Sequence, residues 1–217
     1  MSVSRRAFTK ASLGSAALMT LNPNFSVANE QLIKRVIPSS GESIPIIGVG
    51  TNRYGVGNDL DARAKLKEAL AKFHELGGTV IDTAPSYGSS EVVLGELISD
   101  LGVQKDLFLA SKVDSRNITD NINGFHRSYD RFETTTFDLM QVHNFKDWEN
   151  SLALLKDKKA EGVIRYLGMT THMPSQYDLM ETAIKNHELD FIQVNLSLAN
   201  QRQSSERLIP LAKDSGV

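Results

Sequence analysis

The stretch IDTAPSYGSSEVVLGELI (81–98) decides the fold. Its apolar start predicts a strand over 79–83, because a short apolar run bounded by turn residues is typical of a buried strand. Pro85 and Gly88 predict a loop, and Ser89 and Ser90 are suitable caps for the helix that follows. The helix residues expected to face inward are Val92, Val93, Leu94, Leu97 and Ile98.

The same strand–loop–helix pattern recurs along the chain, which predicts parallel βα units in one domain. A hairpin over 32–38 and 42–50 leads into the first strand. The predicted strands are 46–50, 79–83, 107–113, 137–142, 164–169 and 191–196, and the other predicted helices are 59–76, 117–132, 147–160, 174–186 and 203–214. A closed (β/α)8 TIM barrel needs eight such units in about 250 residues. The sequence therefore predicts an α/β barrel of this type with about six βα units present.

Four polar side chains stand at or just after the carboxyl ends of predicted strands: Asp82, Tyr87, Lys112 and His143. In a parallel barrel these ends converge on one face. A phenol, an ammonium, a carboxylate and an imidazole gathered there are suited to delivering a proton to a carbonyl oxygen. We expect Lys112 to lower the pKa of the Tyr87 phenol and Asp82 to keep Lys112 charged. His143 would orient the carbonyl or relay the proton.

Each of these residues also has a structural interpretation. A loop tyrosine is common, a lysine and an aspartate can form a purely structural ion pair, and a lone histidine at a strand end is usually structural. Their coincidence at successive strand ends favours the functional interpretation.

These motifs resemble the aldo-keto reductase family over about residues 44–217. The matching segments are 47–51, 81–98, 107–113, 137–144, 162–172 and 191–202. The resemblance implies a TIM barrel and an NADP(H)-dependent carbonyl reductase or alcohol dehydrogenase, with NAD(H) as the alternative cofactor. Hydride would come from the nicotinamide, and Tyr87 would donate the proton.

The resemblance also implies a set of cofactor-binding residues: Gly50, Thr51, Asp82, Thr171, His172 and Gln193. The family usually has a Ser-Asn pair where this chain has Thr171-His172. A threonine hydroxyl can replace the serine, and an imidazole N–H can donate to the carboxamide oxygen.

Three other functions fit the sequence less well. Gly48-Val49-Gly50 resembles part of a Rossmann fingerprint, but Arg53 stands where the third glycine is needed. A metal hydrolase built on His143, His172 and Asp82 would leave Tyr87 and Lys112 unexplained, so no metal site is expected. A non-catalytic exported remnant or binding protein that retains the barrel remains the alternative, because the family binds the cofactor phosphates mainly through loops after strands seven and eight.

The composition is that of an ordinary globular domain. The chain has 217 residues, 41% hydrophobic and 23% charged, with a net charge of −2 and no cysteine. Such a charge gives no reason to expect nucleic acid as a partner, and the lack of cysteine excludes disulfides and thiolate sites. A small carbonyl or alcohol is the expected substrate, and no stable membrane insertion is expected.

The first 28 residues form a separate segment. Arg5-Arg6 precedes a modestly apolar run (11–21), and Ser26-Val27-Ala28 offers small residues for cleavage, which resembles a twin-arginine export signal. The sequence thus predicts a signal over 1–28, an oxidoreductase domain over 29–217, the twin-arginine export machinery as a partner and a periplasmic location. The segment 1–28 holds three basic and no acidic residues, so residues 29–217 carry a net charge of −5.

Replacing Arg5-Arg6 with Lys-Lys should keep the protein in the cytoplasm, because a receptor reads the arginine pair itself and not its charge. Cell fractionation and the size of the protein on a gel check this. Processing after Ala28 with wild-type efficiency would show that the signal is of another kind.

Overall fold

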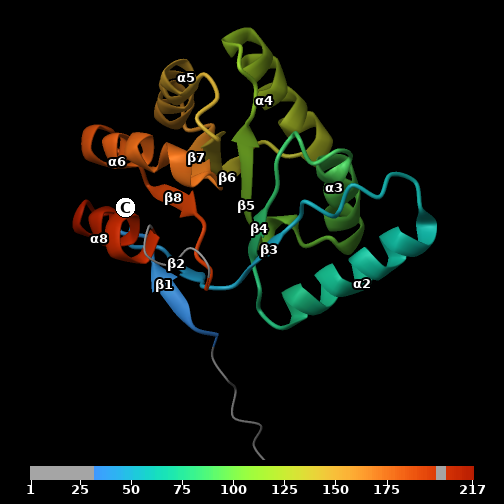
Figure 1. Cartoon of the computed structure of the whole chain (residues 1–217). Coiled ribbons are helices and arrows are strands. Elements are labelled where there is room, and N and C mark those ends of the chain that lie inside the picture. The colour runs from blue at the N-terminus through green and yellow to red at the C-terminus, as the bar shows by residue number, and fades with distance from the viewer. Residues whose placement is uncertain (1–31, 199–203) are drawn as a thin grey trace, which may run out of the picture. The chain divides into compact units, whose positions relative to one another are not determined.

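The computed structural model describes residues 32–198 and 204–217 (Figure 1). The chain divides into two units, Met1–Leu32 and Ile33–Val217, and the second unit contains the helices and strands of the described residues. The predicted export signal over 1–28 lies outside the described residues. Within those residues, no helix combines the length and the apolar character needed to cross a membrane.

Six parallel strands form one curled sheet in the order β3-β4-β5-β6-β7-β8. The strands are β3 (Gly48–Gly50), β4 (Val80–Asp82), β5 (Phe108–Val113), β6 (Phe137–His143), β7 (Ile164–Thr171) and β8 (Phe191–Val194). Before them, β1 (Lys34–Val36) and β2 (Ser43–Pro45) pair as an antiparallel hairpin. Sequential order with parallel pairing is that of a (β/α)8 barrel with six units present, so the predicted fold is confirmed.

Helices follow the parallel strands and lie outside the sheet (Figure 1). They are α2 (Leu60–Glu75), α3 (Ser90–Leu101), α4 (Ile118–Phe132), α5 (Trp148–Ala160), α6 (Tyr177–Asn186) and α8 (Ile209–Asp214). A 3₁₀ turn over Pro174–Gln176 precedes α6, and a π-helical turn over Ser204–Leu208 precedes α8. The side chains of Asp59 and Asn117 cap α2 and α4, which places both helix starts as the sequence predicts.

Two details predicted for the helix that follows strand 79–83, α3, are wrong. Neither serine caps α3: Ser89 Oγ accepts a hydrogen bond from the backbone N–H of Gly57, and Ser90 Oγ donates to the carbonyl of Thr51. Both hydroxyls therefore hold the loop after β3 against α3. Val92 is 37% exposed, because it lies one position outside the stripe that packs on the sheet, whereas Val93 and Leu94 are fully buried.

Successive side chains of each strand point to opposite faces of the sheet and so lie in two different environments. One set of strand side chains packs with the helices in the main core, including Ile81, Met140 and Leu167. The other set faces the inside of the curled sheet, where Phe108, Ala110, Leu139 and Tyr166 form a second cluster with Ile37.

The hairpin closes the amino-terminal end of the sheet. Ile37, just after β1, is 3% exposed within the second cluster. Tyr166 on β7 reaches the same region and donates to Ser40 Oγ at 2.7 Å. The interior is therefore mainly apolar at this end apart from the Tyr166 hydroxyl, whereas the buried charge of Lys112 lies toward the carboxyl end.

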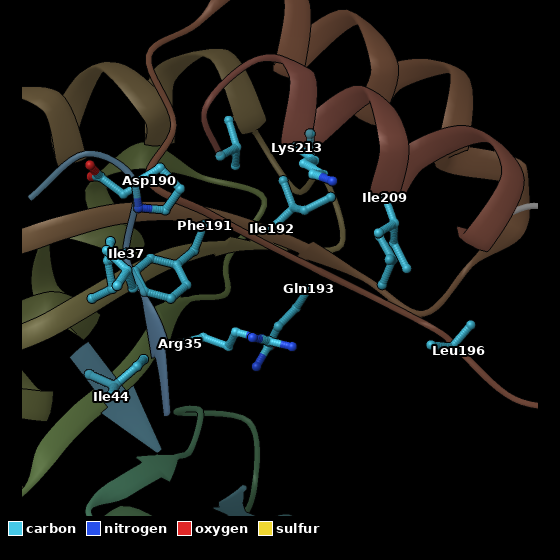
Figure 2. Close-up of a pocket in the computed structure, with 15 residues that line it drawn as sticks. Arg35, Ile37, Ile44, Asp190, Phe191, Ile192, Gln193, Leu196, Ile209 and Lys213 are labelled. Carbon is cyan, nitrogen blue, oxygen red and sulfur yellow. The ribbon is translucent and has the colours of Figure 1, made fainter. Parts of the chain in front are cut away.

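The described sheet ends at β8, and an apolar groove runs beside that strand. Figure 2 shows the groove between the β1–β2 hairpin, β8 and α8, with Phe191, Ile192 and Ile209 among its lining side chains. Its volume is about 500 Å³. It is mainly apolar, so the polar pocket at the carboxyl ends of the strands is the better candidate for chemistry.

Gly95→Ala should lower the free energy of unfolding by at least about 2 kcal/mol, because a Cβ there would lie 2.1 Å from the backbone oxygen of Arg131 on α4. Urea unfolding measures the change. Gly124→Ala is the matched control, since a Cβ at that helical position meets only the flexible end of Arg127 at 3.6 Å. The control should be neutral or stabilised by up to about 1 kcal/mol. Equal effects of the two substitutions would contradict close packing of α3 on α4.

Candidate functional site

The inner face of the sheet becomes polar at the carboxyl ends of the strands. Register places Lys112 beside Gln141 and His143 beside Thr170, and Thr170 is in turn beside Gln193. A pocket of about 320 Å³ opens at this end. Its lining includes Tyr87, Lys112, His143, Thr170, His172 and Gln193.

A buried ion pair forms the centre of the site. Lys112 is 2% exposed, and its Nζ donates to Asp82 Oδ2 and to the carbonyl of Thr83, each at 2.6 Å. Burial lowers the pKa of Lys112, and the charge and hydrogen bond of Asp82 oppose that shift. The structure thus brings Asp82 and Lys112 together as the sequence predicts.

Gln141 holds the second oxygen of Asp82, a role that the sequence did not reveal. Its Nε2 donates to Asp82 Oδ1 at 3.0 Å, whereas its buried Oε1 has no hydrogen-bond partner among the described residues. Gly168 makes room for this side chain, because a Cβ there would lie 3.0 Å from Gln141 Cγ. Asp82 is therefore held by side chains from two strands, β5 and β6.

Tyr87 covers the ammonium of Lys112, which lies 5.2 Å from the centre of the phenol ring. Burial raises the pKa of Tyr87, and the nearby carboxylates of Asp82 and Asp114 raise it further. The prediction that Lys112 lowers this pKa is therefore wrong in its net direction. The cation belongs to an ion pair with Asp82, so it does not outweigh burial and the two carboxylates.

His143 packs edge-on against Tyr87, with the ring centres 6.3 Å apart. Its Nδ1 lies 2.9 Å from Oδ2 of Asp114, a buried residue just past β5 that the sequence did not single out. Asp114 stands two residues after Lys112, and residues two apart in an extended chain point to the same face of a sheet. This spacing was the signal that could have identified Asp114.

The loop after His143 has an unusual backbone. Asn144, Phe145 and Asp147 all have positive φ angles, between 43° and 55°. Such conformations cost about 1–3 kcal/mol each outside glycine and concentrate at functional sites. Asn144 secures the loop through a backbone hydrogen bond to Thr170 at 2.8 Å. Trp148 packs between Phe145 and His187, with ring centres 5.9 and 5.7 Å away.

The residues expected to bind a cofactor fall into two groups. His172 and Gln193 are exposed on the pocket. Thr51 is fully buried and donates to the carbonyl of Asp82, and Thr171 donates to Gln176 Oε1 at 2.6 Å. Both threonine hydroxyls therefore already have protein partners. Gly50 is exposed at the end of β3, and its cofactor contact stays a prediction, as do those of the other five residues.

The sequence of residues 46–217 matches the model of the aldo/keto reductase family. The chain belongs to this family. It is 34% identical to methylglyoxal reductase YeaE of Escherichia coli K12 over 145 residues, which cover 63% of this chain and 49% of that protein. It is 26% identical to aldo-keto reductase YhdN of Bacillus subtilis over 204 residues, which cover 83% and 58% of the two chains. The chain thus spans about half the length of these aldo/keto reductases.

A solved structure, of a putative aldo-keto reductase (PA4992) from Pseudomonas aeruginosa, has the same fold. It superposes with a TM-score of 0.73 at 24% identity and covers 88% of this chain and 79% of its own. Within the described ranges of this aldo/keto reductase, no group of three or more His, Cys, Asp or Glu residues is arranged to hold a metal ion.

Asp82→Asn should lower the free energy of unfolding by about 3–5 kcal/mol, because it leaves the ammonium of Lys112 buried without its carboxylate. The double variant Asp82→Asn/Lys112→Met should recover most of that loss, and urea unfolding of the cycle measures the coupling.

Glu161→Gln is the control for this cycle. It breaks a solvent-exposed pair with Lys158 and should cost less than about 1 kcal/mol. Strict additivity of Asp82→Asn and Lys112→Met would argue against an energetic coupling of the two side chains.

Proposed function

We propose that this chain carries the active site of a carbonyl reductase, or alcohol dehydrogenase in reverse, that uses NADP(H), with NAD(H) as the alternative. One observation carries the proposal: the Tyr87 phenol borders a polar pocket directly above the buried Lys112–Asp82 pair. Family membership supports the reaction class. Small carbonyl compounds are the proposed substrates, and the name of the E. coli relative makes methylglyoxal a suitable first test.

Tyr87 is the proposed proton donor. Its raised pKa keeps the phenol protonated at neutral pH, as a donor to a developing alkoxide must be. Lys112 is a poorer candidate, because its ammonium already donates to Asp82 and Thr83. Proton transfer would leave a tyrosinate beside the Lys112 charge, which stabilises it electrostatically.

The pocket supports binding of the nicotinamide end of the cofactor. Its lining is mainly polar, and the exposed side chains of His172 and Gln193 provide donors and acceptors suited to a carboxamide. We propose that these two residues hold the carboxamide, with Thr170 and Thr171 behind them. The bound nicotinamide supplies the hydride, while the chain positions the carbonyl and provides the proton.

The proposed setting of this reaction is the periplasm. The support is the Arg5-Arg6 motif and the small residues before Asn29, both in the part of the sequence that precedes the described residues.

Tyr87→Phe should reduce kcat for methylglyoxal reduction by at least about 100-fold, because the proposed proton donor is removed. NADPH affinity, measured by fluorescence titration, should stay near wild type. Tyr129→Phe is the matched control: its phenol donates to the carbonyl of Val163 on the helix side of the sheet. It should lose about 1 kcal/mol of stability and keep its kcat.

Near wild-type kcat in Tyr87→Phe would overturn the proton-donor assignment. If the wild-type chain binds no NADPH and reduces no carbonyl, the result would instead favour a barrel that binds without turnover.

A further inference from the structure

Asp114 is a buried carboxylate that the proposed reaction leaves without a role. It follows β5, and its side chain is 4% exposed. Burying a charged carboxylate is costly unless it has partners of opposite charge or hydrogen-bond donors. Asp114 has three such partners: Oδ2 faces His143 Nδ1, Oδ1 forms an ion pair with Lys146, and Ser86 contributes a side-chain hydrogen bond.

These partners decide the charge of the carboxylate. Burial by itself would raise the pKa of Asp114, but His143, Lys146 and Ser86 together hold the pKa well below its usual range. Asp114 is therefore ionised at neutral pH and presents only hydrogen-bond acceptors to its neighbours.

The contact with His143 has a consequence for the imidazole. The Nδ1 and Oδ2 atoms are 2.9 Å apart, although the approach is too bent for a linear hydrogen bond, so the attraction is chiefly electrostatic. A carboxylate at this distance favours the tautomer in which the facing ring nitrogen carries the proton. With Nδ1 buried and turned to Asp114, Nε2 is the nitrogen left for the pocket that His143 lines.

We propose that Asp114 is a positioning residue, which fixes the ring orientation and the Nδ1–H tautomer of His143 so that Nε2 faces the pocket as a hydrogen-bond acceptor for the hydroxyl of an alcohol substrate. This inference rests on the proposed function for its catalytic consequence only. If Asp114 had a purely structural role and only anchored the loop 144–147 through Lys146, its replacement by asparagine would leave the tautomer of His143 unchanged.

The tautomer is measured directly by ¹⁵N-detected NMR of the full chain labelled at histidine, at about pH 8, where an ordinary imidazole is neutral. The chain has five histidines, and the signals absent from a His143→Gln variant assign those of His143. The expected result for the wild type is a proton on Nδ1. A wild-type ring with its proton on Nε2 would overturn the proposal without any variant.

Asp114→Asn supplies the second arm. Its carboxamide can turn an N–H toward Nδ1, so the proton should move to Nε2, as happens when the aspartate of a serine-protease triad is replaced by asparagine. We expect kcat for alcohol oxidation to fall about 10- to 100-fold, the scale found for carboxylates that orient metal-bound histidines, with NADPH affinity unchanged. Asp114→Glu, which retains the charge, should recover part of the lost rate.

Lys146→Met is the matched control, because it removes the other charged partner of Asp114 and leaves the His143 contact in place. It should keep the wild-type tautomer and most of kcat. An unchanged tautomer in Asp114→Asn, or an equal loss of kcat in Lys146→Met, would overturn the proposal. If the wild type reduces no carbonyl, the proposed function fails, while the tautomer spectra still decide the role of Asp114.

Discussion

The need to neutralise one buried ammonium organises the polar end of this barrel. Lys112 lies on the inner face of β5 with almost no exposure, so its charge requires a carboxylate within contact distance. Asp82 on β4 provides it, and Gln141 on β6 then fixes the remaining oxygen of Asp82. Three neighbouring strands are thereby linked through side chains. Tyr87 lies over the resulting pair, so its position depends on that of the ammonium.

The interior divides sharply between its two ends. At the amino end, Phe108, Leu139 and Tyr166 pack with Ile37 from the hairpin. Toward the carboxyl end, later inward positions on two of the same strands are Lys112 and Gln141. Stability therefore comes mainly from one end and from the helix–sheet core, while the other end contains charged and polar groups that cost free energy to bury.

The sequence was sufficient for the fold because the strands and helices have strong and regular apolar patterns. It also identified Asp82, Tyr87, Lys112 and His143 as neighbours, since consecutive parallel strands end on one face. It did not identify Gln141, Thr170 or Asp114. Each stands two positions along the chain from a recognised residue, but such parity alone does not separate a functional side chain from a structural one.

Other errors arose from contacts that join segments far apart in the sequence. The hydroxyl of Ser90 finds its acceptor 39 residues away at Thr51, and so it does not cap its own helix. The pKa of Tyr87 depends on the depth of the phenol and on the carboxylates of Asp82 and Asp114, and neither the depth nor the approach of Asp114 follows from local sequence. Helix starts at Asp59 and Asn117 were placed correctly because their capping contacts are local.

The position of Trp148 gives the protein an internal optical probe. It is the single tryptophan of the chain, and it lies one residue after the positive-φ loop that follows His143. Its indole contacts Phe145 of that loop on one side and the imidazole of His187 on the other. Burial, together with the charge of Lys156, lowers the pKa of His187. Because the single indole of the chain touches Phe145, the intrinsic fluorescence of the unlabelled protein reports on the loop beside the candidate site.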